Sequence, residues 1–389
     1  MINRRLAPRL AEAARSFPAV TLTGPRQSGK STLCRHLFPK KDYVNLETPD
    51  VRNFALEDPR GFLTQYPDGA ILDEVQRTPD LPSYLQPMID NDPEPGKWIL
   101  TGSQNFALLE SVNQSLAGRS AVLSLLPMSF DEISDFADAP KTLDEVLFTG
   151  GYPRIYDKKL SPSQWLASYV ATYIERDVRS VSNVGDLTTF QRFVELCAGR
   201  TGQMINYSNL AGDAGISQPT AKAWMSILEA SYIVFLQPAY STNLRKRLVK
   251  MPKLHFYDTG LACWLLGLRS ADQLATHPLK GSIFESWAVS EIIKHRIHSG
   301  ESPGLFHYRD HRGVEADLIL EHADRLIIGE VKAGQTVTSD LLAPIRNVAH
   351  ALGKAKETEQ VVVFGGQDRQ QRTDALMLPW HEIHDGPWL

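Results

Sequence analysis

Residues 19–32 read AVTLTGPRQSGKST, an apolar strand-like run followed by a glycine-containing loop and the start of a helical stretch. The part from Gly24 to Thr32 fits the pattern GxxxxGK[S/T], in which backbone N–H groups and a helix N-terminus face phosphate groups. The flanking strand and helix are the context that this loop requires. The stretch therefore predicts a phosphate-binding loop, or P-loop, on an α/β sheet.

The positions of this loop have separate expected roles toward ATP. Gly24 and Gly29 let the chain turn, and Lys30 is expected to reach the β- and γ-phosphates. Ser31 is expected to coordinate Mg²⁺ through its hydroxyl, while Thr32 lies one residue deeper and is expected to pack or bond locally. The predicted nucleotide-binding set is Gly24, Pro25, Arg26, Gln27, Ser28, Gly29, Lys30, Ser31 and Thr32, joined by Ser103 and Gln104.

An acidic pair follows the apolar run Ala70-Ile71-Leu72. Asp73 is expected to hold the water shell of Mg²⁺, and Glu74, one residue on, to act as the general base for hydrolysis. In the next apolar run, KWILTGSQN, either Ser103 or Gln104 is expected to sense the γ-phosphate at the same sheet edge. Arg119 is a candidate arginine finger supplied in trans within a ring, and an ordinary surface ion pair is an equally good interpretation.

Bulk composition limits the class of protein. The chain has 389 residues, 42% hydrophobic and 22% charged, which is typical of a globular protein with more than one domain. Its net charge of −4 means that any nucleic-acid contact must come from local basic patches. Cys34, Cys197 and Cys263 lie far apart, which argues against a disulfide framework or a structural zinc site. With no apolar run of about 18 residues, we expect no membrane segment and a cytoplasmic location.

Changes of hydrophobic period divide the chain into four expected segments: a largely parallel α/β core at 1–135, a helical lid or linker at 136–185, a helix-rich segment with a hairpin at 186–260, and a second α/β domain at 261–389. The strands expected in the first segment are Ala19–Thr23, Tyr43–Leu46, Ala70–Leu72, Trp98–Leu100 and Val122–Leu125.

The third segment has the spacing of a helix-turn-helix. A short helix after Tyr207 is followed by a turn and by a helix at 218–231 that Ser217 is placed to cap. With the following hairpin this predicts a winged helix, in which Gln218, Thr220 and Lys222 face the major groove and Arg245, Lys246, Arg247 and Lys250 meet phosphates. A packing or lid module, or a solvated basic face, is the alternative.

The chain resembles a family of AAA+-type ATPases of bacteria and archaea that carry a C-terminal domain of unknown function. The resemblance rests on TGPRQSGKST, ILDEVQRTPDL, ILTGSQ, LAGR, GGYPR, YIERDV, NLRKRLVKMPKLHFYDTGL and the C-terminal EVK, and so covers nearly the whole chain. It implies an AAA-type fold and assembly into a ring.

The last segment carries a separate acidic cluster. Glu285 lies in an expected helix, Asp317 in a strand, and Glu330 and Lys332 at the end of the next strand, an order that resembles PD-(D/E)xK nucleases. Asp317 and Glu330 could chelate Mg²⁺, with Glu285 completing the metal shell, while Lys332 projects from the same strand face as Glu330 and could activate water. This predicts a restriction-endonuclease-like α/β domain, which acts either as a nuclease or only as a binding platform.

The preferred hypothesis is an ATP-hydrolysing DNA-handling motor or switch that forms a homo-oligomer, for which a hexameric ring is one form. Its DNA could be single-stranded or branched. One alternative is a nucleotide-dependent protein-interaction switch with a degenerate nuclease fold, and another is a metal-dependent DNA nuclease licensed by ATP. Arg154 and Arg176 could be nucleotide sensors or structural residues, and the sequence does not decide between these roles.

Overall fold

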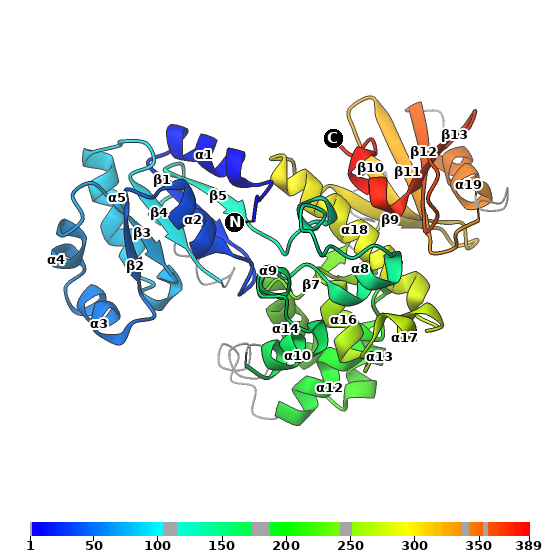
Figure 1. The fold of residues 1–389 in the computed structure, drawn as a ribbon, viewed down its shortest axis with the longest axis horizontal. Coiled ribbons are helices and arrows are strands. Elements are labelled where there is room, and N and C mark those ends of the chain that lie inside the picture. Colours follow the sequence, from blue (N-terminus) through cyan, green and yellow to red (C-terminus); the bar gives the residue numbers. More distant parts are fainter. Residues whose placement is uncertain (1, 104–114, 173–186, 242–250, 337–341, 353–356) are drawn as a thin grey trace. The chain divides into compact units, whose positions relative to one another are not determined.

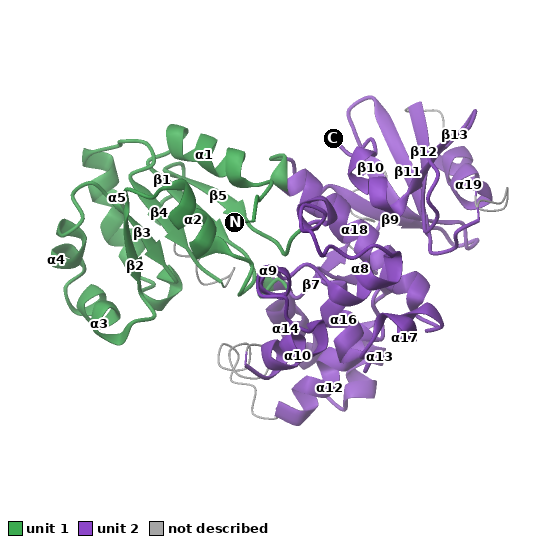
Figure 2. Ribbon diagram, in the orientation of Figure 1, with its two compact units in different colours: residues 1–128, 230–232, 298–300 green, residues 129–229, 233–297, 301–389 purple. Residues whose placement is uncertain are grey.

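The computed structural model describes residues 2–103, 115–172, 187–241, 251–336, 342–352 and 357–389. The chain forms two compact units (Figure 2), of which unit 1 holds Met1–Met128, Ala230–Tyr232 and His298–Gly300 and unit 2 holds the remaining stretches. Both units mix helices with strands (Figure 1), so the α/β class is confirmed.

Unit 1 is built on one five-stranded sheet whose strands are ordered β2-β3-β4-β1-β5. Every pairing in it is parallel. Its strands are β1 Ala19–Thr23, β2 Asp42–Asn45, β3 Ala70–Asp73, β4 Trp98–Thr101 and β5 Ser120–Ser124. Its helices are α1 Ala7–Ser16, α2 Lys30–Leu37, α3 Pro49–Glu57, α4 Pro59–Thr64, α5 Leu81–Asn91 and the short η1 Val75–Arg77. The five predicted strands are present, with bounds that move by one or two residues.

The sheet of unit 1 is buried on both faces. Neighbouring residues of one strand belong to different apolar clusters: Leu72 and Leu100 lie in one, and Ile71 and Ile99 lie in the other. Because successive side chains of a strand point to opposite faces, the two clusters are the two covered sides of the sheet. This explains why these strands read as continuous apolar runs.

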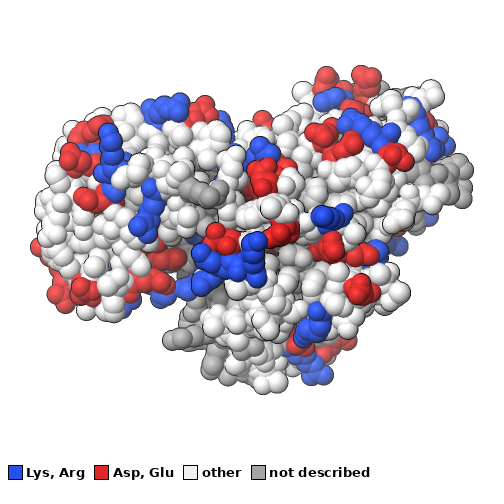
Figure 3. All heavy atoms as spheres, in the orientation of Figure 1, with Lys and Arg blue, Asp and Glu red and all other residues white. Residues whose placement is uncertain are grey.

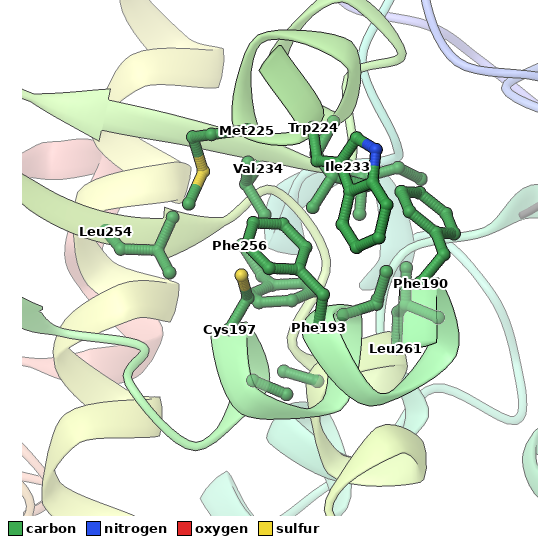
Figure 4. Packing of buried hydrophobic residues seen from close by; sticks show 14 of the residues in the cluster. Phe190, Phe193, Cys197, Trp224, Met225, Ile233, Val234, Leu254, Phe256 and Leu261 are labelled. Carbon is green, nitrogen blue, oxygen red and sulfur yellow. The ribbon is translucent and has the colours of Figure 1, made fainter. Parts of the chain in front are cut away.

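Unit 2 begins with a helical part around a small sheet ordered β6-β8-β7. Its strands are β6 Gln203–Met204, β7 Val234–Gln237 and β8 Lys253–Phe256. Its helices are α7 Phe130–Ile133, α8 Leu143–Thr149, α9 Pro153–Asp157, α10 Pro162–Tyr169, α12 Leu187–Ala198, α13 Tyr207–Ala214, α14 Gln218–Ala230, α16 Thr259–Leu265 and α17 Ala271–Ala275. Figure 4 shows its core, where Trp224 of α14 meets Phe190 and Phe193 of α12 edge-on at centroid distances of 5.2 and 5.4 Å.

Two of the sequence motifs meet in this part of the chain. The carboxylate of Asp258 caps α16 by accepting from the N–H of Leu261, 2.8 Å away, and also accepts from the N–H of Gly151 at 2.6 Å. A Cβ on Gly150 would lie 2.4 Å from the same carboxylate. The GGYPR and YDTGL stretches are therefore explained by a buried structural contact between the turn at Gly150 and Gly151 and the Asp258 cap of α16, and not by a catalytic role.

The rest of unit 2 is a six-stranded sheet ordered β13-β14-β12-β11-β10-β9. Its strands are β9 Leu305–Arg309, β10 Glu315–Glu321, β11 Arg325–Lys332, β12 Glu357–Phe364, β13 Gln370–Gln371 and β14 Leu376–Pro379. Its helices are α18 Lys280–His298, α19 Ala343–Leu352 and the final η4 Trp380–Asp385. β10 and β11 form the predicted antiparallel hairpin, and β11 pairs with β12 in parallel, with α19 between them in the chain.

The sequence did not predict β9 and β14. Strand β9 reads LFHYR, so a buried His307 interrupts its apolar pattern. Among the described residues, no helix has both the length and the apolar character needed to cross a bilayer. Figure 3 shows basic and acidic side chains interspersed over the face in view, in keeping with the small net charge.

Candidate functional site

The P-loop follows the last residue of β1, and its turn depends on glycine. Gly24 has φ +141°, and a Cβ there would lie 2.2 Å from the carbonyl oxygen of Leu125. Gly29 has φ +94° and is the N-cap of α2. Glycine adopts such angles without steric penalty, so the two positions that the motif requires are the two where side chains are excluded or strained.

Lys30 is the first residue of α2, and its side chain folds back over the loop. Its Nζ donates to the carbonyl oxygens of Gly24 at 2.9 Å and Pro25 at 2.8 Å. Burial lowers the pKa of Lys30 to about 8, against the opposing effect of the Glu74 and Asp73 carboxylates. The ammonium is thus held within the loop that is predicted to cradle the phosphates.

Asp73 ends β3 and accepts three hydroxyl groups. Ser31 Oγ and the Tyr43 hydroxyl donate to Oδ2 at 2.8 and 2.5 Å, and Thr101 Oγ1 donates to Oδ1. Because β4 lies between β1 and β3, the end of β4 brings Thr101 beside the acid. Ser31 and Asp73 were predicted to act together. Tyr43 was missed because it belongs to no motif, and Thr101 was missed because the motif ILTGSQ pointed to Ser103 and Gln104 instead.

Glu74 follows Asp73 in the left-handed region, with φ 58° and ψ 45°. A residue other than glycine held there costs on the order of 1–3 kcal/mol, and such strain is found at functional sites. Ser103 Oγ donates to Glu74 Oε2 at 2.9 Å, and Gln76 Nε2 donates to the same oxygen. Ser103, a predicted site residue, therefore lies against the predicted general base, and Gln76 was missed.

A further contact of the loop was also missed. Arg4, which precedes α1, donates from Nη1 to the carbonyl oxygen of Ser28 at 2.6 Å and from Nη2 to that of Leu126 at 2.7 Å. Its guanidinium ties the P-loop to the chain that follows β5. No local pattern around Arg4 could have indicated this, because its partners lie 24 and 122 residues away.

The other predicted loop residues differ in their surroundings. Ser28 Oγ is fully buried and has no hydrogen-bond partner among the described residues. Arg26 is within 3.3 Å of Glu47, and Gln27 has φ 64°. Thr32, which was expected to pack or bond locally, is exposed on α2. Gln104 lies outside the described residues.

Arg119 lies at the other edge of the sheet. It donates to Asp90 from Nε at 2.5 Å and from Nη2 at 3.0 Å, which is the surface ion pair given as the alternative. Arg119 directly precedes β5, and its carbonyl accepts from the N–H of Ala19 at the start of β1. Four residues of strand, roughly 13 Å, separate that end from the P-loop. Arg119 therefore cannot serve the nucleotide of its own chain, and its role in trans stays a prediction.

The acidic residues of the last segment come together around a cavity of about 560 Å³. Lys253 Nζ, from β8, lies 2.6 Å from Glu285 Oε1 and 2.8 Å from Asp317 Oδ1. Lys332 Nζ lies 2.5 Å from Glu330 Oε1, so these two side chains do share a strand face. We call Glu285, Asp317, Glu330, Lys332 and Lys253 the C-terminal cluster.

Burial dominates the electrostatics of the C-terminal cluster. It raises the pKa of Glu285 to about 8 and that of Glu330 to about 7. Burial also lowers the pKa of Lys253, but Asp317 and Glu285 outweigh it and hold that pKa above its ordinary value. Within the described part of the chain, no group of three or more His, Cys, Asp and Glu side chains has the geometry to hold a metal ion. Lys253 was missed by the sequence analysis, and the metal assignment stays a prediction.

The predicted DNA-contacting residues fall in two places. α13 and α14 are joined by a three-residue turn in which Gly215 has φ +74° and Ser217 Oγ accepts from the N–H of Thr220 at 3.2 Å. Gln218 and Lys222 are exposed at the start of α14, and Thr220 is half-buried. The predicted wing residues Arg245, Lys246, Arg247 and Lys250 lie outside the described residues. So does Arg176, whereas Arg154 is exposed on α9.

Comparison with known proteins divides the chain into three matching stretches. Residues 16–134 match the profile of an AAA domain, residues 140–272 match "Domain of unknown function (DUF8612)", and residues 280–383 match "Domain of unknown function (DUF4143)". The AAA match supports a P-loop ATPase family for the first stretch, and with it ATP binding and hydrolysis at the level of that family.

Among curated proteins, the chain is similar to the "Uncharacterized protein Rv2008c" of Mycobacterium tuberculosis and the "Uncharacterized protein Mb2031c" of Mycobacterium bovis. Each is 26% identical over 381 residues, which cover 97% of this chain and 83% of the relative. Among solved structures, the Walker-type ATPase PABY2304 of Pyrococcus abyssi matches at a TM-score of 0.43 and 14% identity, over 68% of this chain and 96% of that one.

Proposed function

We propose that the protein hydrolyses ATP with Glu74 as the general base and uses the cycle as a DNA-handling motor or switch. The observation that carries the hydrolytic part is the pair of adjacent carboxylates at the end of β3. Asp73 is bonded to Ser31 of the P-loop, and Glu74 is bonded to Ser103 after the neighbouring strand. Two acids with separate partners at one sheet edge suit two separate roles, one toward a metal and one toward water.

The residues present fit a nucleotide with Mg²⁺. Among the described residues, the loop offers the buried Ser28 Oγ without a hydrogen-bond partner, a Lys30 ammonium that donates to loop carbonyls, and a turn that excludes side chains at Gly24. Ser31 and Asp73 would hold Mg²⁺, which when bound neutralises charge on the phosphate oxygens. Lys30 would exchange its loop carbonyls for phosphate oxygens.

Glu74 would accept a proton from the attacking water. Its carboxylate is oriented from one side by Ser103 and Gln76, which bond to the same oxygen and leave Oε1 for water. Ser103 is thus a positioning residue, because it touches Glu74 and is placed to register changes at the γ-phosphate. Arg119 could act as an arginine finger only from another copy of the chain, in line with the proposed homo-oligomer.

DNA is the proposed partner because of the start of α14. A helix that is capped by Ser217, preceded by a tight turn and exposed at Gln218 and Lys222 offers donors at the end that enters a major groove in helix-turn-helix proteins. The arrangement α12, β6, α13, α14, β7 and β8 supports interpreting this part as a winged helix. The order α18, β9, β10, β11, α19 and β12 likewise supports the nuclease-like interpretation of the last segment.

A protein-directed switch is the second candidate, and the ammonium of Lys253 favours it. A nuclease-like cluster whose acids are already paired with a lysine is better suited to a binding platform than to cleavage. An ATP-licensed nuclease would need Glu285 and Asp317 to exchange that lysine for a metal ion.

The DNA proposal is tested by measuring steady-state ATP hydrolysis of the wild type with single-stranded, duplex and four-way-junction DNA. We expect turnover to rise with at least one form, and substitution of Gln218 and Lys222 by Ala to reduce the rise while basal turnover is kept. A matched substitution of the exposed Gln164 on α10 should leave the rise unchanged. Turnover that no DNA form alters would favour the protein-directed switch.

A further inference from the structure

The cavity of the C-terminal cluster contains a cation supplied by the chain itself. The Nζ of Lys253 lies between Glu285 of α18 and Asp317 of β10, at 2.6 and 2.8 Å. All three side chains are only 11–13% exposed. Carboxylates packed this closely repel one another when ionised, so a buried pair needs a positive charge between its members.

The other cations that line the cavity are paired elsewhere. Lys332 is bonded to Glu330 of its own strand, and Arg309 lies 3.5 Å from Glu315 of the neighbouring strand. Lys253 is therefore the cation that serves both Glu285 and Asp317. No second ammonium or guanidinium within the described part of the chain forms an ion pair with these two acids.

Hydrogen bonds fix the backbone that carries Lys253 against the strand that carries Asp317. Gln237 of β7 donates from Nε2 to the carbonyl oxygen of Asp317 at 2.9 Å, and its Oε1 lies 3.1 Å from Nε2 of His255 on β8. The N–H of Val331 donates to Asp317 Oδ2 at 3.0 Å. Both the lysine and the acid are thus held in place by neighbours other than each other.

One oxygen of the cluster lacks a partner. Glu330 is 3% exposed and lines the cavity, and its Oε1 bonds to Lys332 while its Oε2 has no hydrogen-bond partner among the described residues. A buried carboxylate oxygen without a donor is costly, and a bound cation is what would satisfy it. The cavity therefore holds oxygen ligands for a divalent cation but has an ammonium in their midst.

We propose that Lys253 is the built-in cation of this site: it takes the place of a divalent metal, so that the wild-type chain binds none there. Removing its charge converts Glu285, Asp317 and Glu330 into a divalent-cation site made of hard oxygen ligands. The lysine thus keeps the C-terminal cluster free of metal, and the proposal stands independently of ATP hydrolysis. Lys253 thus occupies the position at which the nuclease-like interpretation expects a metal ion.

The test is Mn²⁺ binding to the nucleotide-free full-length protein, followed by the loss of the free-ion signal in electron paramagnetic resonance. We compare the wild type with Lys253→Met and with the double variant Lys253→Met/Glu285→Gln. All three proteins have the same P-loop, so Mn²⁺ bound at the P-loop contributes equally to each and does not affect the comparison. We expect Lys253→Met to bind one more Mn²⁺ per chain than the wild type. The double variant should lose that gain.

Two further proteins sharpen the comparison. Lys280→Met removes another partly buried lysine of unit 2, paired with Asp144 at 2.6 Å, and should gain no Mn²⁺ site. Lys253→Arg keeps the positive charge and should bind no Mn²⁺ at the C-terminal cluster. If Lys253→Met is less stable than the wild type without metal, a rise of its melting temperature on adding Mn²⁺, absent from Lys280→Met, supports the proposal equally.

Two results would overturn the proposal. One is a Mn²⁺ site in the wild type that the single substitution Glu285→Gln removes, because the lysine would then give way to the metal. This measurement does not depend on the folding of any Lys253 variant. The other is a folded Lys253→Met protein that binds no more Mn²⁺ than the wild type.

Discussion

At the scale of single residues, the ATP site depends on how the second carboxylate is held. Glu74 sits in a left-handed conformation and receives hydrogen bonds from Ser103 and Gln76 at one oxygen. A general base has to be oriented toward its water, and loss of an orienting bond lowers turnover more than it lowers substrate affinity.

We therefore expect Ser103→Ala to lower kcat for ATP hydrolysis by roughly tenfold, with KM for ATP changed by less than about twofold. Steady-state kinetics at saturating Mg²⁺ measures both. Ser83→Ala is the matched control, because Ser83 Oγ bonds to Ser115 Oγ at 2.7 Å in the same unit, and its kcat should match the wild type. A larger change in KM than in kcat would mean that Ser103 binds the nucleotide rather than positions Glu74.

The turn of the P-loop gives a second prediction at this scale. Gly24→Ala places a Cβ 2.2 Å from the Leu125 carbonyl oxygen, at φ +141°, whereas Gly118→Ala also has a positive φ, +74°, but no described atom within 4 Å. Both variants place a residue with a Cβ at a positive φ, which costs on the order of 1–3 kcal/mol, but only Gly24→Ala also creates a clash. Urea unfolding should show a destabilisation at least about 1 kcal/mol larger for Gly24→Ala. Equal effects would mean that the loop relaxes around the added methyl.

The sequence predicted the residues of this site that lie within one motif. Gly24, Lys30 and Ser31 are contiguous, and Asp73 with Glu74 directly follows an apolar strand, so local pattern was sufficient. Arg4, Tyr43 and Thr101 reach the site through contacts across the sheet or between distant segments, which no spacing rule encodes. Lys253 was missed for the same reason: its acids lie 32 and 64 residues away. Gln76 lies only two residues from Glu74, but the pattern of the Asp-Glu pair assigns no role to that position.

At the scale of elements, the final turn η4 is fastened to α18 by a buried ion pair. His384 Nε2 lies 2.9 Å from Glu291 Oε2, and Lys294 Nζ lies 2.8 Å from Glu291 Oε1. Burial lowers the pKa of His384, but the hydrogen bond and charge of Glu291, with Asp131, raise it above the ordinary histidine value. The charge of Lys294 lowers the pKa of His384, and burial together with the charge of His384 lowers the pKa of the neighbouring His295.

This pair predicts a pH dependence of stability. A histidine whose pKa is raised by folding stabilises the folded state fully below the unfolded pKa of about 6.5 and loses that contribution as pH rises through the folded pKa. We expect the melting temperature of the wild type to fall between pH 6 and pH 8 by more than that of His384→Gln. His350→Gln, at an exposed position on α19, should show the same fall of melting temperature with pH as the wild type. A slope unchanged in His384→Gln would show that the pair carries no pH-dependent stability.

The elements themselves were predicted best where their apolar pattern was complete. Strands β1, β3 and β4 of unit 1 and the hairpin of β10 and β11 were found because each is a largely continuous buried run. The edge strands β2 and β5 are only partly buried and were found with shifted bounds. Strand β9 was missed, since its buried His307 and terminal Arg309 break the pattern. The order of strands in either sheet could not be predicted from periodicity, because pairing is set by contacts between segments far apart in sequence.

At the scale of the whole molecule, an ATPase unit is followed by a second unit of unknown activity. The AAA match covers residues 16–134, and the carboxyl edge of the unit 1 sheet gathers the predicted chemistry. The interspersed charges of Figure 3 and the net charge of −4 leave local surfaces, such as the start of α14, to make any contact with DNA. The second unit contributes the helix pair α13 and α14, for which the helix-turn-helix role is proposed, and the C-terminal cluster with Lys253 between its acids.

The most direct test of the central claim is ATP hydrolysis by Glu74→Gln, measured beside ATP binding by the same protein. A carboxamide keeps the shape and the hydrogen bond to Ser103 but cannot accept the proton of water. The account predicts that ATP still binds with near wild-type affinity while turnover falls by about a hundredfold or more. Hydrolysis by Glu74→Gln at the wild-type rate would contradict the account, because the carboxylate could not then be the general base.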